Sequence, residues 1–96
     1  MKDQRYNHVL SVWKAGDLTS FSKIFSIVPK SIVSVDLGLN YGRFARKLNN
    51  PDLLSFSEII KMAQLFNLDY RVIVGLVLQA IDEKKKQAFE ASMSAY

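Results

Sequence analysis

The chain has 96 residues, 49% of them hydrophobic, and carries 13 Lys and Arg against 9 Asp and Glu. That length excludes two domains and suits one domain with a single modest core. The absence of cysteine excludes a disulfide framework and a thiolate zinc site, so packing has to stabilise the fold. The formal net charge of +4 is a mild basic bias, compatible with a polyanionic partner but common in proteins that bind none.

Neither a secretion signal nor a membrane span is predicted from the sequence. Residues 1–5 lack the apolar run of a signal peptide. The longest apolar stretch, Val72 to Leu78, is far shorter than the roughly 20 residues that a membrane-spanning helix needs. We therefore expect a soluble cytoplasmic protein with no membrane partner.

A first helix is predicted directly after the N-terminus. Asp3 is suited to cap its start, and Gly16 supplies the positive φ angle that commonly closes a helix. Its apolar residues recur at helical spacing and are expected on one face: Tyr6, Val9, Leu10 and Trp13. We interpret residues 1–18 as an extra N-terminal helix of the single domain.

A second helix is predicted to begin after Thr19 or Ser20 and to end at Pro29. Its apolar residues follow the i, i+3, i+4, i+7 spacing of a helix: Phe21, Ile24, Phe25 and Val28. Pro29 also suits the first turn of the next segment, which reads as a helix of about two turns that ends at Gly38.

Two helices are predicted in the last third of the chain. Ser55 opens the first of them, and together with Glu58 it has the form of a capping box. The core face of this helix is expected to hold Phe56, Ile59, Ile60, Ala63 and Phe66. Asp69 caps the last helix, whose apolar stripe is Val72, Ile73, Leu76, Val77, Ala80 and Ile81. After Asp82 the pattern thins, and we interpret residues 83–96 as a C-terminal tail that begins as a fraying helix end.

The segment from Lys30 to Asn49 has the pattern of a helix-turn-helix. Gly38 permits the left-handed backbone of a tight turn, and Asn40 is a good cap for the second helix, predicted from Tyr41 to about Leu48. Because Phe44 and Leu48 point inward, helical spacing turns a second set of residues toward solvent: Tyr41, Gly42, Arg43, Arg46 and Lys47. The second helix is therefore predicted to present a basic face.

The order of these residues resembles a known family. The matching residues are Val33, Ser34, Leu37, Gly38, Leu39 and Phe44 in the motif, followed by the run from Ser55 to Asp69. Residues 19–82 resemble the lambda-repressor-like, or Cro/repressor-type, helix-turn-helix family of bacterial and phage DNA-binding proteins. The resemblance implies an all-α compact domain of about five or six helices with a central helix-turn-helix. We expect a single helical domain over residues 1–96, with residues 19–82 as its core.

The resemblance also implies which residues touch DNA. In that family the second helix of the motif lies in the major groove, and the start of the first helix touches phosphate. By position, base reading falls to Tyr41, Gly42 and Arg46, and a phosphate contact to Lys30. The full predicted DNA-binding set is Lys30, Asn40, Tyr41, Gly42, Arg43, Arg46 and Lys47. Double-stranded DNA is thus the expected partner, and regulation of transcription by sequence-specific binding the expected function.

Two residues depart from the family's pattern. The family usually has its last core residue where this chain has Lys47, and the apolar residue arrives one position later at Leu48. Gly42 contributes no side chain to reading a base. The alternative hypothesis is therefore a helical protein–protein interaction module of the same architecture that does not bind DNA.

Catalysis is not predicted. His8 is the only histidine, so the chain offers neither a histidine metal site nor a histidine base with a nucleophile beside it. The four glycines form no phosphate-cradling loop, and paired carboxylates at catalytic spacing are not evident. We expect a protein that is not an enzyme, with no metal, no cofactor and no small-molecule substrate.

Self-association is predicted from apolar residues left over once the core is filled. The first helix and the stripe from Val72 to Ile81 carry more of them than a small core needs. A homodimer is the expected use, since two copies bind two half-sites on DNA, whereas extra core is the alternative. Lys84 to Lys86 are interpreted as a solubilising helix end rather than a second DNA contact.

Overall fold

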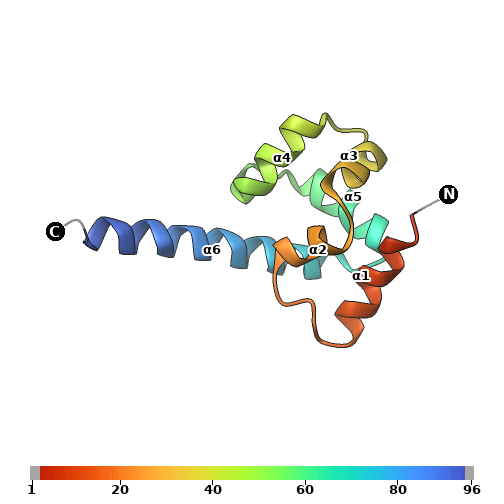
Figure 1. The fold of residues 1–96 in the computed structure, drawn as a ribbon, viewed down its shortest axis with the longest axis horizontal. Helices are drawn as coiled ribbons and strands as arrows, with labels where there is room; N and C mark the ends of the chain where they lie inside the picture. Colours follow the sequence, from red (N-terminus) through yellow and green to blue (C-terminus); the bar gives the residue numbers. More distant parts are fainter. Residues whose placement is uncertain (1–2, 95–96) are drawn as a thin grey trace.

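Six α-helices and one short 3-10 helix make up the computed structural model, which describes residues 3–94 (Figure 1). The helices are α1 (Arg5–Lys14), α2 (Phe21–Ile27), α3 (Lys30–Leu37), α4 (Tyr41–Asn49), η1 (Pro51–Leu53), α5 (Phe56–Phe66) and α6 (Tyr70–Ser94). Residues 3–94 contain no strand. The predicted all-α class and the upper limit of the predicted helix count are confirmed.

Side-chain caps fix where the helices begin. The Ser20 hydroxyl accepts the Lys23 N–H at 3.3 Å, and the Asn40 amide oxygen accepts the Arg43 N–H at 3.1 Å. At the start of α5, Ser55 and Glu58 form the predicted reciprocal capping box. Each of these bonds satisfies a backbone donor that a helix leaves without an intrahelical partner. The local sequence signals therefore place these starts correctly.

Left-handed residues close three of the helical segments. Gly16 and Gly38 have φ angles of 78° and 69°, as the sequence predicts. Asn67, which was not predicted to be special, has a φ of 56° and ends α5. Asparagine is one of the few side chains that tolerate this conformation. The turn from α5 into α6 is thus made without a glycine.

The core gathers side chains from all six helices. The residues fully withdrawn from solvent include Val9, Ile24, Val28, Val33, Phe44, Met62 and Ile73. Helix α1 packs against α2 and α5, and its buried Tyr6 ring meets the Phe66 ring edge-on at 5.5 Å. The first helix therefore contributes to the core, which is the alternative use predicted for its apolar residues.

Three residues expected on buried faces are instead exposed, which corrects the sequence prediction. Phe56 is 74% exposed, Ile60 42% and Trp13 41%. In α5 the stripe that faces the core is Ile59, Met62, Ala63 and Phe66. That stripe is centred away from Ile60, and Phe56 is the first residue of the helix, where the chain enters it from outside the core.

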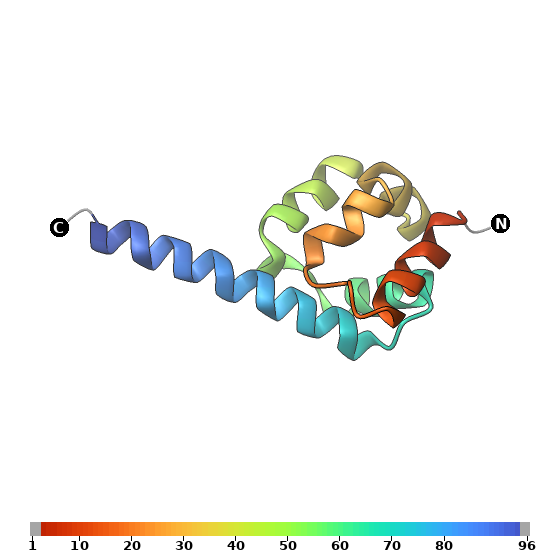
Figure 2. The same ribbon diagram turned by 60° about the horizontal axis from the view of Figure 1, so that its bottom comes forward.

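Helix α6 continues far beyond the predicted fraying point. It runs unbroken from Tyr70 to Ser94, and its C-terminal half extends away from the other helices in both views (Figures 1 and 2). After Gly75 the sequence contains neither glycine nor proline and is rich in Ala, Lys, Glu and Gln, which favour helix. Among the helices of residues 3–94, none combines the length and apolar character required to cross a bilayer.

Candidate nucleic-acid interface

Helix α3 is held in place by its buried face and by one bond from α1. Val33, Ser34 and Leu37 are buried, and the Ser34 hydroxyl donates to the Ser31 carbonyl at 2.8 Å. The Tyr6 hydroxyl donates a hydrogen bond to the Asp36 carboxylate. Burial of the phenol and this bond to a carboxylate both raise the pKa of Tyr6. The bond joins α1 to α3, although α2 lies between them in the sequence.

The turn after α3 sets the direction of α4. With Gly38 in the left-handed conformation, the Leu39 N–H donates to the Ser34 carbonyl at 2.9 Å and closes α3. Helix α4 then begins after its cap, Asn40. Its fully buried Phe44 meets the Phe25 ring edge-on at 6.0 Å. A single aromatic anchor on one face of α4 therefore leaves the opposite face outward.

The outward face of α4 carries two free arginines. Tyr41, Gly42, Arg43 and Arg46 are all exposed, and Tyr41 retains 54% of its accessible surface. Arg43 and Arg46 make no side-chain hydrogen bond or ion pair with any residue that the structure describes. Figures 1 and 2 show α4 at the outer edge of the helical body. Both guanidinium groups are therefore available to an external partner.

Local charge strengthens the positive character of this face. The segment from Leu37 to Pro51 contains Arg43, Arg46 and Lys47 and no carboxylate. The preceding carboxylate, Asp36, accepts the bond from Tyr6. Since neither arginine has a neighbouring acid in sequence or a bound one in space, their charges remain uncompensated.

Lys47 is placed differently from the arginines, because it is bound within the protein. Its ammonium group lies 3.0 Å and 2.8 Å from the two oxygens of the Glu58 carboxylate. The same carboxylate accepts the Ser55 N–H at 2.9 Å. Burial alone would raise the pKa of Glu58, but the hydrogen bonds from Lys47 and Ser55 outweigh it and lower that pKa. The pair joins the end of α4 to the start of α5.

This ion pair accounts for the charged residue at an expected core position. The Lys47 side chain is only half-buried, and Leu48 beside it packs partly against the core. A lysine stem can cover apolar surface while its ammonium reaches a carboxylate. Sequence reasoning missed the pair, although a lysine in an apolar register and a capping-box glutamate 11 residues later were the available signals.

The other two predicted site residues lie at the margin of this face. Asn40 is exposed, and its amide oxygen is occupied by the helix cap. Lys30 is the first residue of α3 and half-buried, and it lines a cleft together with Leu48 and Asn49. The structure thus groups Tyr41, Gly42, Arg43 and Arg46, and separates Lys30 and Lys47 from them.

A metal centre is not among the candidate sites that the structure offers in residues 3–94. Within the described residues, no group of three or more His, Cys, Asp or Glu side chains is arranged to hold a metal ion. Comparison of the chain with protein-family models, curated proteins and solved structures finds no significant match. The exposed arginines of α4 are therefore the main structural ground for a functional conclusion.

Proposed function

We propose that the chain binds double-stranded DNA as a sequence-specific regulator of transcription, with α3 and α4 as a helix-turn-helix of the lambda-repressor-like kind. The observation that carries the proposal is the pair Arg43 and Arg46, exposed and unpaired on a helix whose opposite face is anchored by Phe44. A helix whose one face is anchored in the core and whose opposite face is cationic and exposed has the form of an element that enters the major groove.

Each exposed residue has a distinct proposed role. Arg46 lies one turn after Gly42 on the side of α4 opposite Phe44, so it is the side chain best directed at base edges. Gly42 leaves room for the backbone to approach the groove floor. Arg43 and Tyr41 lie to the two sides of this line and are assigned to the phosphate backbone, which supplies affinity rather than specificity.

Lys47 is omitted from the proposed contact set. Its ammonium would have to leave Glu58 to reach a phosphate, and that would strand a buried carboxylate without its partner. Lys30 remains a proposed phosphate contact, since its side chain forms no ion pair with any residue in the described part of the chain.

Salt-dependent binding to a labelled duplex tests the proposal. The logarithm of the affinity should fall linearly with the logarithm of salt concentration, with a slope of about −0.9 for each phosphate contacted. Arg43→Ala should make the slope shallower by about 0.9, because one phosphate contact is lost. Arg46→Ala should weaken binding to a selected site by about 1 to 3 kcal/mol and relax specificity at the bases it reads.

Arg71→Ala is the matched control, because it removes the same type of side chain from α6, away from α4. Arg71 is exposed and pairs only loosely with Asp69, at 3.6 Å. Its loss should leave the affinity for the selected site nearly unchanged. If Arg71→Ala and Arg46→Ala lower the affinity equally, binding depends on net charge alone and not on the position of Arg46. An absence of binding to any duplex would favour a protein-interaction module instead.

A second copy of the chain is the proposed protein partner. Leu78 is 55% exposed on α6, and half-buried Val74 and Ile81 share its face at helical spacing. The half of α6 that extends from the body follows directly after these residues (Figure 2). An isologous contact there would join two α4 helices in one assembly, which doubles the number of arginines available to DNA.

A further inference from the structure

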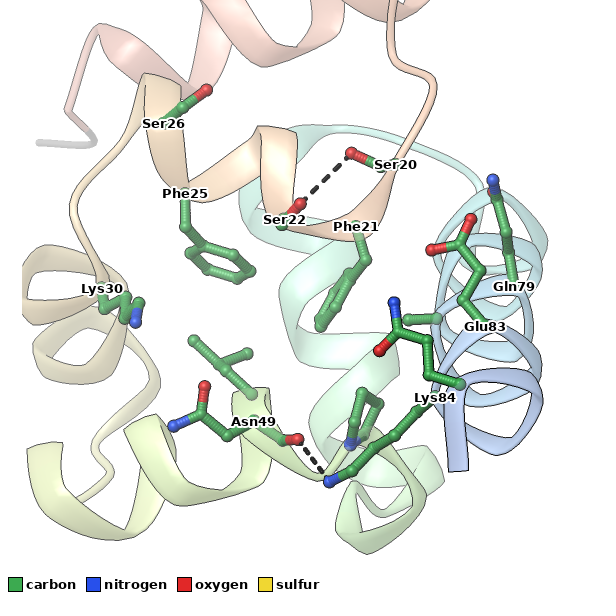
Figure 3. Close-up of a pocket in the computed structure, with 14 residues that line it drawn as sticks. Ser20, Phe21, Ser22, Phe25, Ser26, Lys30, Asn49, Gln79, Glu83 and Lys84 are labelled. Carbon is green, nitrogen blue, oxygen red and sulfur yellow. Dashed lines mark hydrogen bonds between the residues drawn. The ribbon is translucent and has the colours of Figure 1, made fainter. Parts of the chain in front are cut away.

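A cleft of about 650 Å³ lies between α2, the end of α4 with η1, and α6 (Figure 3). Its apolar lining consists of Phe21, Phe25, Leu48, Pro51 and Ala80. The Phe21 and Phe25 rings are 5.3 Å apart and nearly perpendicular, so together they form two walls of a corner. The volume falls within the roughly 300 to 1,000 Å³ of small-molecule sites, and the corner suits a flat apolar group.

The rim of the cleft is more cationic than acidic. Lys30 and Lys84 line it, against Glu83 as the one carboxylate among its lining residues. Lys84 donates to the Asn49 carbonyl at 2.9 Å and to the Asn50 side chain, so its ammonium is already held. Lys30 has no such bond within the described residues, and it lies at the margin of the cleft in Figure 3. An anionic group beside Phe25 would supply the partner that Lys30 lacks.

We propose that this cleft binds a small organic anion with a flat apolar body, and that the anion competes with DNA for Lys30. The first half of this inference concerns the cleft alone. The second half rests on the proposed function, in which Lys30 is a phosphate contact. One ammonium group cannot make its full set of bonds to a ligand carboxylate and to a phosphate at the same time.

The cleft is also joined to α4 through its aromatic wall. Phe25 lines the cleft on one side and meets Phe44, the anchor of α4, on the other, at 6.0 Å. A ligand that shifts Phe25 therefore acts on the residue that positions the arginine face. Because such coupling is reciprocal, DNA should weaken ligand binding by the same factor as the ligand weakens DNA binding.

Binding is tested without DNA, by amide chemical shifts of the full chain titrated with 2-naphthoate. The neutral 2-naphthamide has nearly the same shape and is the matched control ligand. The shifts should concentrate in residues 20–30, 48–51 and 79–87, and naphthoate should bind about fivefold more tightly than the amide. Shifts spread over the whole chain, or equal affinity for the two ligands, would overturn the proposed anion site.

Three variants separate the contributions of charge and shape. Lys30→Gln should remove the preference for naphthoate over naphthamide, since it removes the ammonium group among the lining residues that is not already held by the protein. Ser22→Trp should block both ligands by filling the rim of the cleft. Lys23→Gln, on the exposed side of α2, should change neither affinity. Retention of the preference in Lys30→Gln would assign the anion to another group and overturn the role of Lys30.

The coupling is measured as the affinity for duplex DNA with and without saturating naphthoate. The ligand should weaken DNA binding of the unaltered chain by several-fold. It should weaken that of Lys30→Gln less, because only the coupling through Phe25 and Phe44 remains, and it should have no effect on Ser22→Trp, which does not bind it. Localised ligand shifts in a protein that binds no DNA would reject the proposed function and keep the site. DNA binding that is unaffected by a bound ligand would reject the competition alone.

Discussion

At the scale of single residues, Gly38 and Gly75 allow the effect of backbone strain to be measured apart from that of steric space, because both have open space and only Gly38 has a positive φ angle. A methyl group on Gly38 or on Gly75 would meet no heavy atom within 4 Å, but Gly38 has a φ of 69° and Gly75 lies within α6. Gly38→Ala should lower the free energy of unfolding by about 1 kcal/mol or more, because alanine is strained there. Gly75→Ala should raise it by up to about 1 kcal/mol. Urea denaturation measures both, and equal effects would contradict the assigned turn.

The ion pair between Lys47 and Glu58 predicts a dependence of stability on pH. Because the pKa of Glu58 is lowered in the folded protein, its stabilising contribution is complete above the ordinary value of 4.5 and is lost as pH falls through the lowered value. Glu58→Gln should therefore cost about 1 kcal/mol at neutral pH and less at about pH 3.

Denaturation of both proteins across this range gives the measurement. Asp3, whose pKa is lowered to about 2 by its hydrogen bonds to Arg5, is present in both and cancels in the difference. A difference between the two proteins that stays constant from neutral pH to about pH 3 would show that the Glu58 carboxylate contributes no charge interaction.

The same pair marks a limit of prediction from sequence. The caps Ser20, Asn40 and Ser55 could be predicted because each signal lies within a few residues of the group it satisfies. The partner of Lys47 lies across the start of another helix, so its identity depends on how two elements cross. For that reason Lys47 could be predicted on the cationic face and yet be bound inside the protein.

At the scale of the helices, α6 joins a segment that packs in the core to a segment that is exposed to solvent. From Ile73 to Val77 it carries buried core residues, whereas residues 82–87 are exposed. Amide hydrogen exchange should therefore be slower at residues 73–77 than at residues 84–87, since local opening of the latter exposes little apolar surface. Equal protection of the two segments in dilute solution would contradict this assignment and indicate that another surface covers the extension.

The predicted end of α6 was wrong because the prediction relied on the apolar period. The apolar period stops at Ile81, and the period was the signal used to predict helix. Helix propensity does not stop there, because no breaker follows Gly75. A solvated helix leaves no periodic apolar pattern, so the pattern predicts the packed part of a helix better than its extent.

At the scale of the whole molecule, the proposed dimer has a direct test. Light scattering of the purified chain over about 1 to 200 µM should show a mass that rises toward twice that of one chain. Leu78→Ser should shift this transition to higher concentration, because it removes the most exposed apolar side chain of the α6 face. Val35→Ser on α3, also an exposed apolar residue, is the control and should leave the mass unchanged. A constant monomer mass would reject the dimer.

The arrangement of the helices was less predictable than the helices themselves. The cleft between α2 and α6 joins residues some 60 positions apart, such as Gln79, whose amide donates to the Thr19 carbonyl at 3.2 Å. Periodicity predicts which face of a helix is apolar, but it does not predict which other helix that face packs against. For the same reason the sequence left two uses open for the apolar face of α1, a dimer contact and extra core, and Tyr6 and Val9 are buried in the core.

The cap of α4 has a consequence for the kind of duplex the protein would select. With the Asn40 oxygen occupied by the Arg43 N–H, the polar groups that Asn40 and Arg46 offer to the bases are chiefly hydrogen-bond donors. In the major groove guanine presents two acceptors, while the cytosine amino group is itself a donor. We therefore expect the preferred operator to place guanines on the strand that α4 faces. Replacing such a guanine by cytosine would set the cytosine amino group, a donor, against a donor of the protein.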